Sequence, residues 1–334
     1  MYQGRGDKLE ILKVNSLRKY FPVKKGLTTK TMLVRAVDGV DFSVDEDKIF
    51  ALVGESGCGK STVARLVLGL IPPTSGEVLF QGMNVFGLNN NAMKSFRKSV
   101  QIIFQDPFAS LNPRKSIMDT VSEPLKIHRI IEKSRIKETV VELLGRVGLG
   151  PDLLHRYPHE LSGGQRQRIC IARALAVSPK VIVADEPLSA LDVSVQAQII
   201  NLLQELKREY RLSFLFISHD LKVVHYFSDT IGVMYLGKIV EHAQTEELFR
   251  EPFHPYTEVL LSSAPVIPTS GFMHYESRIT RITSRIVRGE IPSPIDIPPG
   301  CPFHPRCPKR FEPCDKIVPE LRETKGRLVS CHLF

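Results

Sequence analysis

Residues 54–62 read Gly-Glu-Ser-Gly-Cys-Gly-Lys-Ser-Thr and match the phosphate-loop pattern G-x-x-x-x-G-K-[ST]. The apolar run at 49–53 predicts a buried parallel strand before this stretch, and residues 63–70 predict a helix after it. Strand, loop and helix in this order are the context that the pattern requires. Glycines let the backbone wrap phosphates closely, and N–H groups at a helix start bind anions. The stretch therefore predicts binding of a nucleoside triphosphate.

Two residues of this loop predict phosphate and metal contacts. The Lys60 ammonium would reach the β- and γ-phosphates, and the Ser61 hydroxyl would bind Mg²⁺. A glycine-rich turn that precedes a helix by chance would not need both residues in these places. The nucleotide-binding residues expected in this stretch are Gly54, Ser56, Gly57, Cys58, Gly59, Lys60, Ser61 and Thr62.

Composition limits the class of protein. The chain has 334 residues, of which 43% are hydrophobic and 24% charged, as in ordinary globular proteins of more than one domain. No apolar run is long enough for a membrane-spanning helix, and the polar N-terminus predicts no signal peptide, so we expect a cytoplasmic location. The net charge of +9 is compatible with nucleic acid, an anionic membrane surface or an anionic ligand. Because no basic stripe is interleaved with aromatic residues, a nucleic-acid partner is not expected.

Short apolar runs alternate with helical patterns along most of the chain. This alternation predicts an α/β fold with a mostly parallel sheet. Residues 33–44 predict paired strands, residues 230–241 predict a closing hairpin, and residues 117–149 predict a helical region.

Prolines become frequent beyond residue 255, which places a domain boundary there. We expect a nucleotide-binding domain at residues 1–254, with a helical part at about 106–165, and a small irregular domain at 255–334.

Polar residues follow two of the predicted strands. Asp185 and Glu186 follow the apolar run 181–184, and His219 comes soon after the run 214–217. The carboxyl ends of parallel strands meet at one edge of a sheet, where ligands bind. Beside a phosphate loop, Asp185 would hold Mg²⁺ and Glu186 would polarise the attacking water. Without the loop, a surface acidic pair and a surface histidine would be the ordinary interpretation.

The stretch Leu-Ser-Gly-Gly-Gln at residues 161–165 opens another predicted helix. Ser162 is a favourable N-cap residue, and Gly163 and Gly164 allow a close approach of the backbone. The stretch is therefore a second helix start that can bind an anion, and a plain capped helix is the alternative.

Together these motifs resemble the ATPase subunits of ABC transporters. The similarity covers about residues 8–245 and includes, in order, the phosphate loop, Gln105, the 161–165 stretch, Asp185–Glu186, residues 189–192 and His219. It implies an ABC-type ATPase, in which an antiparallel β part and a helical subdomain accompany the mostly parallel sheet.

The resemblance also implies a composite site for ATP. Two ATPase subunits would pair head to tail and clamp each ATP between the phosphate loop of one subunit and the 161–165 stretch of the other. Glu186 would be the general base, and His219 would contact the γ-phosphate. The residues expected to contact ATP from the other subunit are Leu161, Ser162, Gly163, Gly164 and Gln165. Further implied residues are Gln105 for Mg²⁺ and for coupling to the membrane subunits, Asp192 at the dimer interface, and Tyr20 stacked on adenine, with Phe21 as the alternative.

Four of the six cysteines lie in the last 34 residues, with the spacing C-x₅-C-x₆-C-x₁₆-C: Cys301, Cys307, Cys314 and Cys331. Four thiolates can bind Zn²⁺ or an iron–sulfur cluster. Zinc sites usually contain two tight cysteine pairs, so the wide gaps favour a [4Fe–4S] cluster and leave Zn²⁺ as the alternative. His304 and His332 are possible substitute ligands, and four thiols without a metal are the alternative interpretation.

The tail resembles the C-terminal extension of oligopeptide and dipeptide importer ATPases, on residues 253–257, 289–294 and 299–308. Residues 19–26 resemble the second of the two ATPases in such importers. The resemblance implies a structural [4Fe–4S] cluster on the four cysteines and a heterodimer with a sister ATPase, or a homodimer in isolation. It also implies two membrane permeases, an indirect extracytoplasmic peptide-binding protein, and a peripheral location at the cytoplasmic face of the membrane. Residues 45–48, Asp-Glu-Asp-Lys, depart from the Gly-Glu turn usual in the family.

Several functions compete at this point. Import of dipeptides or oligopeptides is favoured, and importers of nickel or peptides share the same motifs. A soluble ABC ATPase acting on nucleic acid is disfavoured, because such proteins usually carry two cassettes in one chain. A redox-sensing tail is a further hypothesis of lower rank.

Overall fold

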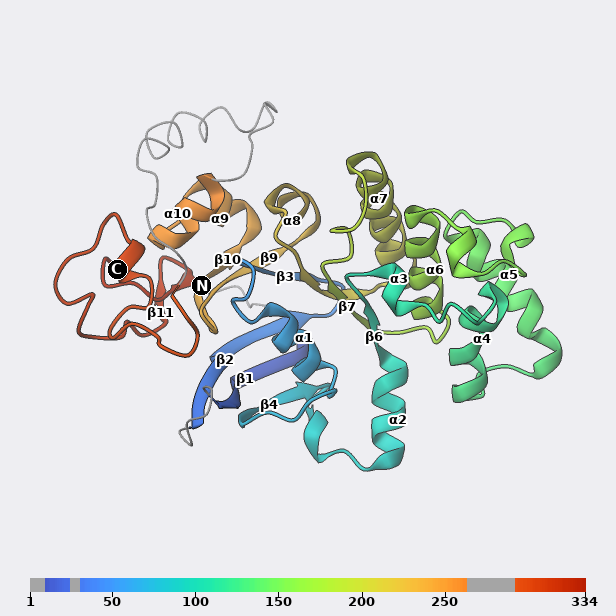
Figure 1. Ribbon diagram of the computed structural model, residues 1–334, viewed down its shortest axis with the longest axis horizontal. Helices are drawn as coiled ribbons and strands as arrows, with labels where there is room; N and C mark the ends of the chain where they lie inside the picture. Colours follow the sequence, from blue (N-terminus) through green and yellow to red (C-terminus); the bar gives the residue numbers. More distant parts are fainter. Residues whose placement is uncertain (1–9, 25–30, 263–291) are drawn as a thin grey trace, which may run out of the picture. The chain divides into compact units, whose positions relative to one another are not determined.

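The computed structural model describes residues 10–24, 31–262 and 292–334 (Figure 1). Residues 25–26 and 289–291, which belong to two of the resemblance stretches, lie outside this part. The chain forms two compact units, and each is built from segments that are separated in sequence. The first unit comprises Met1–Leu12, Val44–Ile49 and Leu79–Ile217, and the second comprises Lys13–Ser43, Phe50–Val78 and Ser218–Phe334.

Three short apolar strands form the parallel sheet of the first unit. β7 (Val181–Asp185) lies between β6 (Val100–Ile103) and β8 (Ser213–Ile217). The register places Val183 beside Ile102 on one side and beside Leu215 on the other. β8 is buried along its whole length, as expected for a strand covered on both faces. The strands predicted at 181–184 and 214–217 are therefore confirmed.

Helix α6 (Gly163–Leu175) is the central helix of the first unit and contacts β6, α3, α4, α5 and α7 (Figure 1). The other helices of this unit are α2 (Asn90–Ser99), α3 (Pro107–Ser110), α4 (Ile117–His128), α5 (Ile136–Arg146) and α7 (Val193–Tyr210). Short elements complete it: strand β5 (Met83–Asn84) and 3₁₀ turns at Val85–Gly87, Lys133–Arg135, Pro151–Leu153 and Pro158–Glu160. The helical region predicted at 117–149 is confirmed as α4 and α5.

Helix α2 was not predicted from the sequence. Phe96 is its one buried residue, and the apolar residues Ala92, Met93 and Phe96 span little more than one turn, so the periodic pattern is too short to indicate a helix by itself. The available signal was Asn89, whose side chain accepts a hydrogen bond from the Ala92 N–H at 3.0 Å and caps the helix.

The second unit contains a mixed sheet. β3 (Ile49–Val53) pairs in parallel with β9 (Thr230–Tyr235), and β9 forms an antiparallel hairpin with β10 (Lys238–Gln244). This hairpin confirms the prediction for residues 230–241. On its other side β10 pairs with β12 (Arg327–Val329), which pairs in turn with β11 (Arg322–Thr324).

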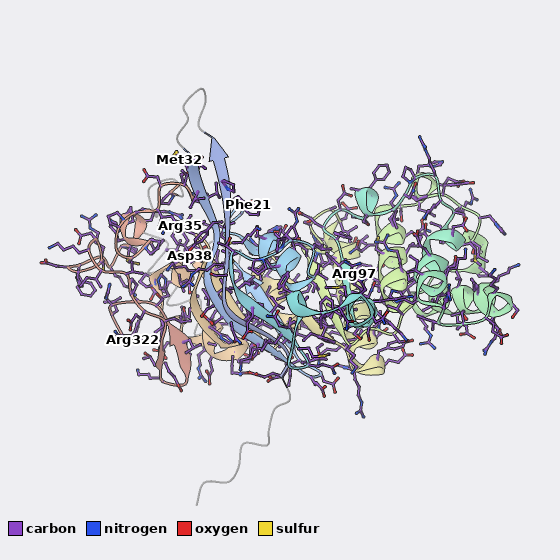
Figure 2. All side chains as sticks on the ribbon, turned by 90° about the horizontal axis from the view of Figure 1, so that it is seen from below. Phe21, Met32, Arg35, Asp38, Arg97 and Arg322 are labelled. Atoms are coloured by element: carbon purple, nitrogen blue, oxygen red, sulfur yellow. The ribbon has the colours of Figure 1, made fainter. Side chains whose placement is uncertain are left out.

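A further sheet contains the neighbouring strands β2 (Thr31–Asp45), β1 (Glu10–Lys24) and β4 (Ser75–Phe80). Figure 2 labels Phe21 on β1 and Arg35 and Asp38 on β2. The prediction of two paired strands within residues 33–44 is wrong, because β2 is one continuous strand through these residues. Its side chains alternate in burial before and after residues 37–39, and Gly39 takes a positive φ of 77° without reversing the chain.

The described residues of the second unit form the helices α1 (Lys60–Val67), α8 (Leu221–Phe227), α9 (Thr245–Arg250) and α10 (Pro255–Ser262), with a 3₁₀ turn at His304–Arg306. Glu241 on β10 ties the segment before α10 to the sheet. It is fully buried, and its carboxylate accepts the backbone N–H groups of Phe253 and His254, both at 2.9 Å. Arg327 lies 3.8 Å from the same carboxylate. Among the described residues, no helix is long and apolar enough to cross a membrane.

Candidate functional site

The phosphate-loop stretch connects β3 to α1, as predicted. Gly54 and Gly59 have φ values of 153° and 113°, which disfavour any residue with a Cβ atom. A Cβ atom on Gly54 would lie 2.2 Å from the Met234 carbonyl oxygen, and one on Gly59 would lie 2.1 Å from the Ala36 carbonyl oxygen. The loop therefore passes so close to neighbouring backbone that only glycine fits at these two positions.

Lys60 opens helix α1 and folds back over the loop. Its ammonium donates hydrogen bonds to the carbonyl oxygens of Gly54 at 2.8 Å and Glu55 at 3.1 Å. The side chain is 4% exposed, so a positive charge is held inside the loop. An ammonium beside the N-terminus of a helix can bind a polyphosphate.

The other loop residues differ in exposure. Ser56 and Gly57 are exposed, while Ser61 and Thr62 are half-buried on the first turn of α1. Cys58 is buried, and burial raises the pKa of its thiol. Cys58 therefore packs as a small apolar residue and remains protonated at neutral pH.

Tyr20 lies on β1 and contacts the neighbouring strand. Its hydroxyl donates a hydrogen bond to Asp38 Oδ1 at 2.5 Å, and the Arg35 guanidinium lies 6.0 Å from the centre of its ring. Burial, followed by the bond to Asp38, raises the pKa of Tyr20. The alternative residue, Phe21, is 38% exposed.

His219 lies in the second unit, just before helix α8, and is exposed. The following Asp220 caps α8 by accepting the N–H of Lys222 at 2.9 Å.

Three of the predicted site residues meet within the first unit. β7 ends at Asp185, and Glu186 follows with a φ of 46°, in the left-handed region that residues other than glycine seldom adopt. The Glu186 N–H donates to the Ile217 carbonyl at 2.9 Å, which fixes this backbone beside the end of β8. Gln105 Nε2 donates to Glu186 Oε2 at 3.1 Å. Backbone strain of this kind is typical of functional sites.

The stretch 161–165 begins helix α6, as predicted. The Ser162 hydroxyl accepts the Gln165 N–H at 3.3 Å, and Gln165 Oε1 accepts the Ser162 N–H at 3.0 Å, which is a complete capping box. A Cβ atom on Gly164 would lie 2.8 Å from Val195 Cγ1 of α7, so the two helix starts pack closely. Asp192, the residue before α7, is exposed.

One residue near this stretch escaped the sequence reasoning. Gln167 on α6 is fully buried, and its Nε2 donates to the Pro187 carbonyl at 2.8 Å. It thus joins the helix that starts at Ser162 to the residue that follows Glu186. Its helical position offers no sequence signal, because a glutamine on a helix is normally a surface residue.

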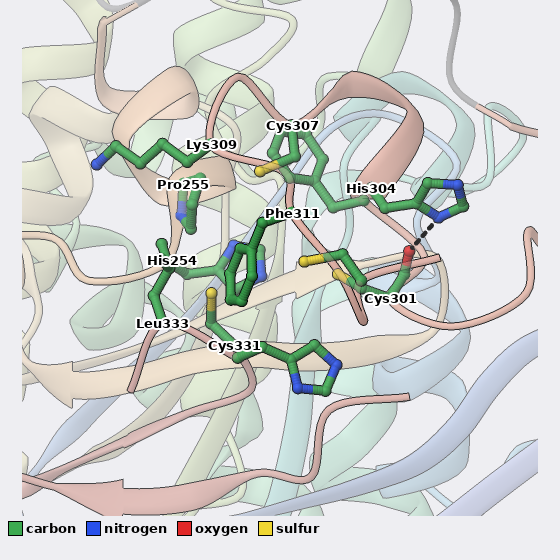
Figure 3. Close-up of a pocket in the computed structure, with 12 residues that line it drawn as sticks. His254, Pro255, Cys301, His304, Cys307, Lys309, Phe311, Cys331 and Leu333 are labelled. Atoms are coloured by element: carbon green, nitrogen blue, oxygen red, sulfur yellow. Dashed lines mark hydrogen bonds between the residues drawn. The ribbon is translucent and has the colours of Figure 1, made fainter. Parts of the chain in front are cut away.

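The four late cysteines line one cavity, together with His254, Phe303, His304, Phe311 and His332 (Figure 3). All four are free thiols. Burial raises the pKa of Cys301 to about 11 and also raises the pKa of Cys307 and of Cys331. As thiolates the four sulfurs would repel one another, and this repulsion adds to the rise in the pKa of Cys301, Cys307 and Cys331.

The arrangement of the side chains does not itself support the metal centre that the sequence predicts. Within the described part of the chain, no group of three or more His, Cys, Asp or Glu side chains is arranged to hold a metal ion. His304 and His332 line the same cavity, but each directs a ring nitrogen to a backbone carbonyl, of Cys301 at 3.0 Å and of Ile317 at 2.8 Å. His254 also lines the cavity, and its Nδ1 accepts the Tyr256 N–H at 3.0 Å. With these three histidines engaged by the backbone, the four thiols are the cysteine and histidine donors that remain among the described lining residues.

Comparison with known proteins extends these observations. Residues 37–189 match the ABC transporter family, and residues 240–314 match the C-terminal region of the oligopeptide/dipeptide transporter family. The oligopeptide transport ATP-binding protein AppF of Bacillus subtilis is 50% identical over 97% of this chain and 97% of its own. The dipeptide transport ATP-binding protein DppF of Escherichia coli is 46% identical over 96% of this chain and 93% of its own.

Solved structures agree with this assignment. A dimeric ATP-binding cassette in a post-hydrolysis state, bound to ADP and Pi, superposes with a TM-score of 0.62 and 28% identity. The match covers 70% of this chain and 98% of that one. CbiO1 of Clostridium perfringens gives a TM-score of 0.62 and 29% identity, and covers 72% of this chain and 91% of its own. The chain therefore belongs to the ABC transporter family, as an ATPase subunit with the C-terminal region of the oligopeptide and dipeptide transporters.

Proposed function

We propose that this ATPase powers the import of dipeptides or oligopeptides through a membrane transporter. The observation that carries the proposal is the presence, in one chain, of the ABC motifs and the C-terminal region of oligopeptide/dipeptide transporters. AppF and DppF are described as oligopeptide and dipeptide transport ATP-binding proteins, and each matches nearly the whole chain. An ATPase of a related nickel or peptide importer is the second candidate, because it would share these motifs.

We assign nucleotide binding to the phosphate loop. The residues concerned are Gly54, Ser56, Gly57, Cys58, Gly59, Lys60, Ser61 and Thr62. Backbone N–H groups and the Lys60 ammonium would bind the phosphates, and Tyr20 would stack on the adenine. Mg²⁺ prefers oxygen ligands, and Ser61, Gln105 and Asp185 would supply them. The narrow glycine turn and the buried Lys60 charge support this assignment.

We assign the general base to Glu186. Its carboxylate would take a proton from the attacking water, while the water oxygen bonds to the γ-phosphorus and the bond to the leaving ADP oxygen breaks. The left-handed backbone and the hydrogen bond from Gln105 support this role, because both restrict where the carboxylate lies. His219 would contact the γ-phosphate.

We propose that the active form pairs two ATPase subunits. Leu161, Ser162, Gly163, Gly164 and Gln165 of one subunit would contact the ATP held by the other, and Asp192 would lie at the interface between them. The exposed Ser162 at a helix start supports this role, because such a position binds an anion. A sister ATPase would be the partner in the transporter, and a second copy of this chain would be the partner in isolation.

The remaining partners follow from the importer proposal. Two membrane permeases would bind the ATPases at the cytoplasmic face of the membrane, and a peptide-binding protein would act indirectly from the other side. Residues 1–254, with the helical part at about 106–165, would form the nucleotide-binding domain. Residues 255–334 would form the C-terminal extension.

We propose that Cys301, Cys307, Cys314 and Cys331 hold a [4Fe–4S] cluster. The cavity that the four thiols share supports this, and the all-sulfur donor set suits such a cluster. A zinc ion is the alternative, but it needs all four sulfurs at about 2.3 Å from one point. When bound, the cluster would join chain segments that are otherwise linked by few regular elements, and would therefore be structural.

Stimulation of ATP hydrolysis tests the transport proposal. The chain is assembled with its permeases and sister ATPase, and the ATPase rate is measured with peptide-loaded binding protein, with nickel-loaded binding protein, and with DNA or RNA. We expect stimulation by the peptide-loaded protein. The proposal would be refuted if nucleic acid stimulates ATP hydrolysis and neither loaded binding protein does. Stimulation by the nickel-loaded binding protein alone would favour the second candidate.

Metal analysis tests the cluster proposal. The protein is purified without oxygen, and iron, acid-labile sulfide and zinc are measured per chain. We expect about four iron and four sulfide. Stoichiometric zinc without iron would overturn the assignment.

A further inference from the structure

Glu55, at a variable position of the phosphate loop, is held by a residue from the far end of the sequence. Its two carboxylate oxygens accept hydrogen bonds from Arg306 Nη1 at 2.8 Å and Arg306 Nη2 at 2.9 Å. The two side chains are 26% and 9% exposed, so water screens the pair only in part. A bidentate pair of this kind fixes direction as well as distance.

The backbone of the same residue is held as well. The Glu55 N–H donates to the Tyr256 hydroxyl at 2.9 Å. Tyr256 is fully buried and packs against the rings of Tyr235 and Phe303, with centroids 4.6 Å and 5.4 Å away. Both the side chain and the amide of Glu55 are therefore tied to the region that follows residue 254.

The hydrogen bonds that hold Glu55 also affect the position of Lys60. Its ammonium donates to the Gly54 and Glu55 carbonyl oxygens, so the placement of Glu55 determines one of its two carbonyl acceptors. A loop that binds phosphate through its backbone must hold its N–H groups in fixed directions. A shift of Glu55 would move both the amides and the ammonium.

The turn that carries Arg306 is itself anchored at the thiol cavity. The His304 N–H donates to the Cys301 carbonyl at 2.9 Å, and the Arg306 N–H donates to the Phe303 carbonyl at 3.0 Å. The guanidinium lies 5.9 Å from the centre of the Phe303 ring. Cys301 and Phe303 both line the thiol cavity.

We propose that Arg306 is a positioning residue for ATP binding, which acts through Glu55 to hold the phosphate loop in its binding conformation. The C-terminal extension is then part of the nucleotide site. This inference rests on the proposed role of the loop in binding ATP.

The experiment is a double-mutant cycle on the assembled transporter, with the dissociation constant for ATP as the readout. The variants are Arg306→Met, Glu55→Gln and their combination, with Arg306→Lys as the conservative change. Lys309→Met is the matched control, because Lys309 lies three residues along the same segment and its ion-pair partner, at 2.5 Å, is Glu258 of α10 instead of a loop residue. Lys60→Met reports whether the loop binds ATP at all.

We expect Arg306→Met to weaken ATP binding about tenfold, within the usual range of coupling between two sites. Glu55→Gln should act in the same direction, and the combined variant should bind no more weakly than the weaker single variant. Arg306→Lys should recover only part of the affinity, because lysine keeps the positive charge but cannot make the bidentate contact. Lys309→Met should change the affinity less than about twofold, since its ion pair with Glu258 does not involve a residue of the loop.

Two results would overturn the inference. One is ATP affinity within twofold of wild type in folded Arg306→Met or, if that variant does not fold, in Glu55→Gln. The other is a combined variant whose loss equals the product of the two single losses. Normal ATP binding by Lys60→Met would instead refute the proposed role of the loop itself. This variant therefore distinguishes failure of the loop assignment from failure of the role proposed for Arg306.

Discussion

Substitution of Ser162 tests whether its hydroxyl only caps helix α6 or also contacts ATP as proposed. Ser162→Ala loses the bond from the Gln165 N–H, at 3.3 Å, but keeps the bond from its own N–H to Gln165 Oε1. Loss of one N-cap acceptor costs about 1 kcal/mol. Ser116→Ala is the matched control, because the Ser116 hydroxyl accepts the Asp119 N–H at 3.1 Å at the start of α4, in the same unit.

Both substitutions should lower the free energy of unfolding by about 1 kcal/mol in urea titrations followed by circular dichroism. Only Ser162→Ala should slow ATP hydrolysis. A lost hydrogen bond to a charged phosphate costs about 1.5–3 kcal/mol, or roughly 10- to 150-fold in rate. Equal losses of ATPase activity in the two variants, or a wild-type rate in Ser162→Ala, would mean that the Ser162 hydroxyl does not contact ATP.

Three further predictions concern the second unit. Glu241→Ala removes the acceptor of two buried N–H groups and leaves Arg327 without this carboxylate, so urea titration should show a loss of about 3–5 kcal/mol in unfolding free energy; a loss below about 1 kcal/mol would contradict this. Burial lowers the pKa of His254 from 6.5 to about 3, so the unfolded chain binds the proton more tightly. The unfolding free energy should therefore fall by up to about 1.4 kcal/mol per pH unit from about pH 6.5 to 5, and His254→Gln should flatten this slope; equal slopes would count against a neutral buried His254. Gly59→Ala places a Cβ atom 2.1 Å from the Ala36 carbonyl oxygen, so calorimetry should show ATP binding weakened at least about tenfold, whereas unchanged affinity would mean that the loop adapts.

Local patterns predicted the parts of the site that each lie in one short stretch. The phosphate loop, the Ser162 cap and the strand that ends at Asp185 are fixed by neighbouring residues, and all three were correctly placed. The continuous strand β2 was missed because alternation does not distinguish one long strand from two short ones. Its pairing with β1 depends on contacts outside the stretch.

Contacts between distant residues were beyond sequence reasoning. Glu55 and Arg306 are 251 positions apart, and neither the loop pattern nor the cysteine spacing relates them. The spacing did indicate that the four cysteines act together, and the structure places all four around one cavity. It could not show the carbonyl contacts of His304 and His332, which depend on the fold of the tail.

Peptide uptake tests the central claim most directly, namely that ATP hydrolysis with Glu186 as the base drives peptide import. The transporter is reconstituted in vesicles with wild-type chain or with Glu186→Gln, and ATP-dependent uptake of labelled dipeptides and oligopeptides is measured. Glutamine keeps the shape of the side chain but cannot accept the proton. We expect uptake with the wild-type chain and none with Glu186→Gln, although ATP still binds. Uptake that survives in Glu186→Gln, or that is absent with the wild-type chain while ATP is hydrolysed, would contradict it.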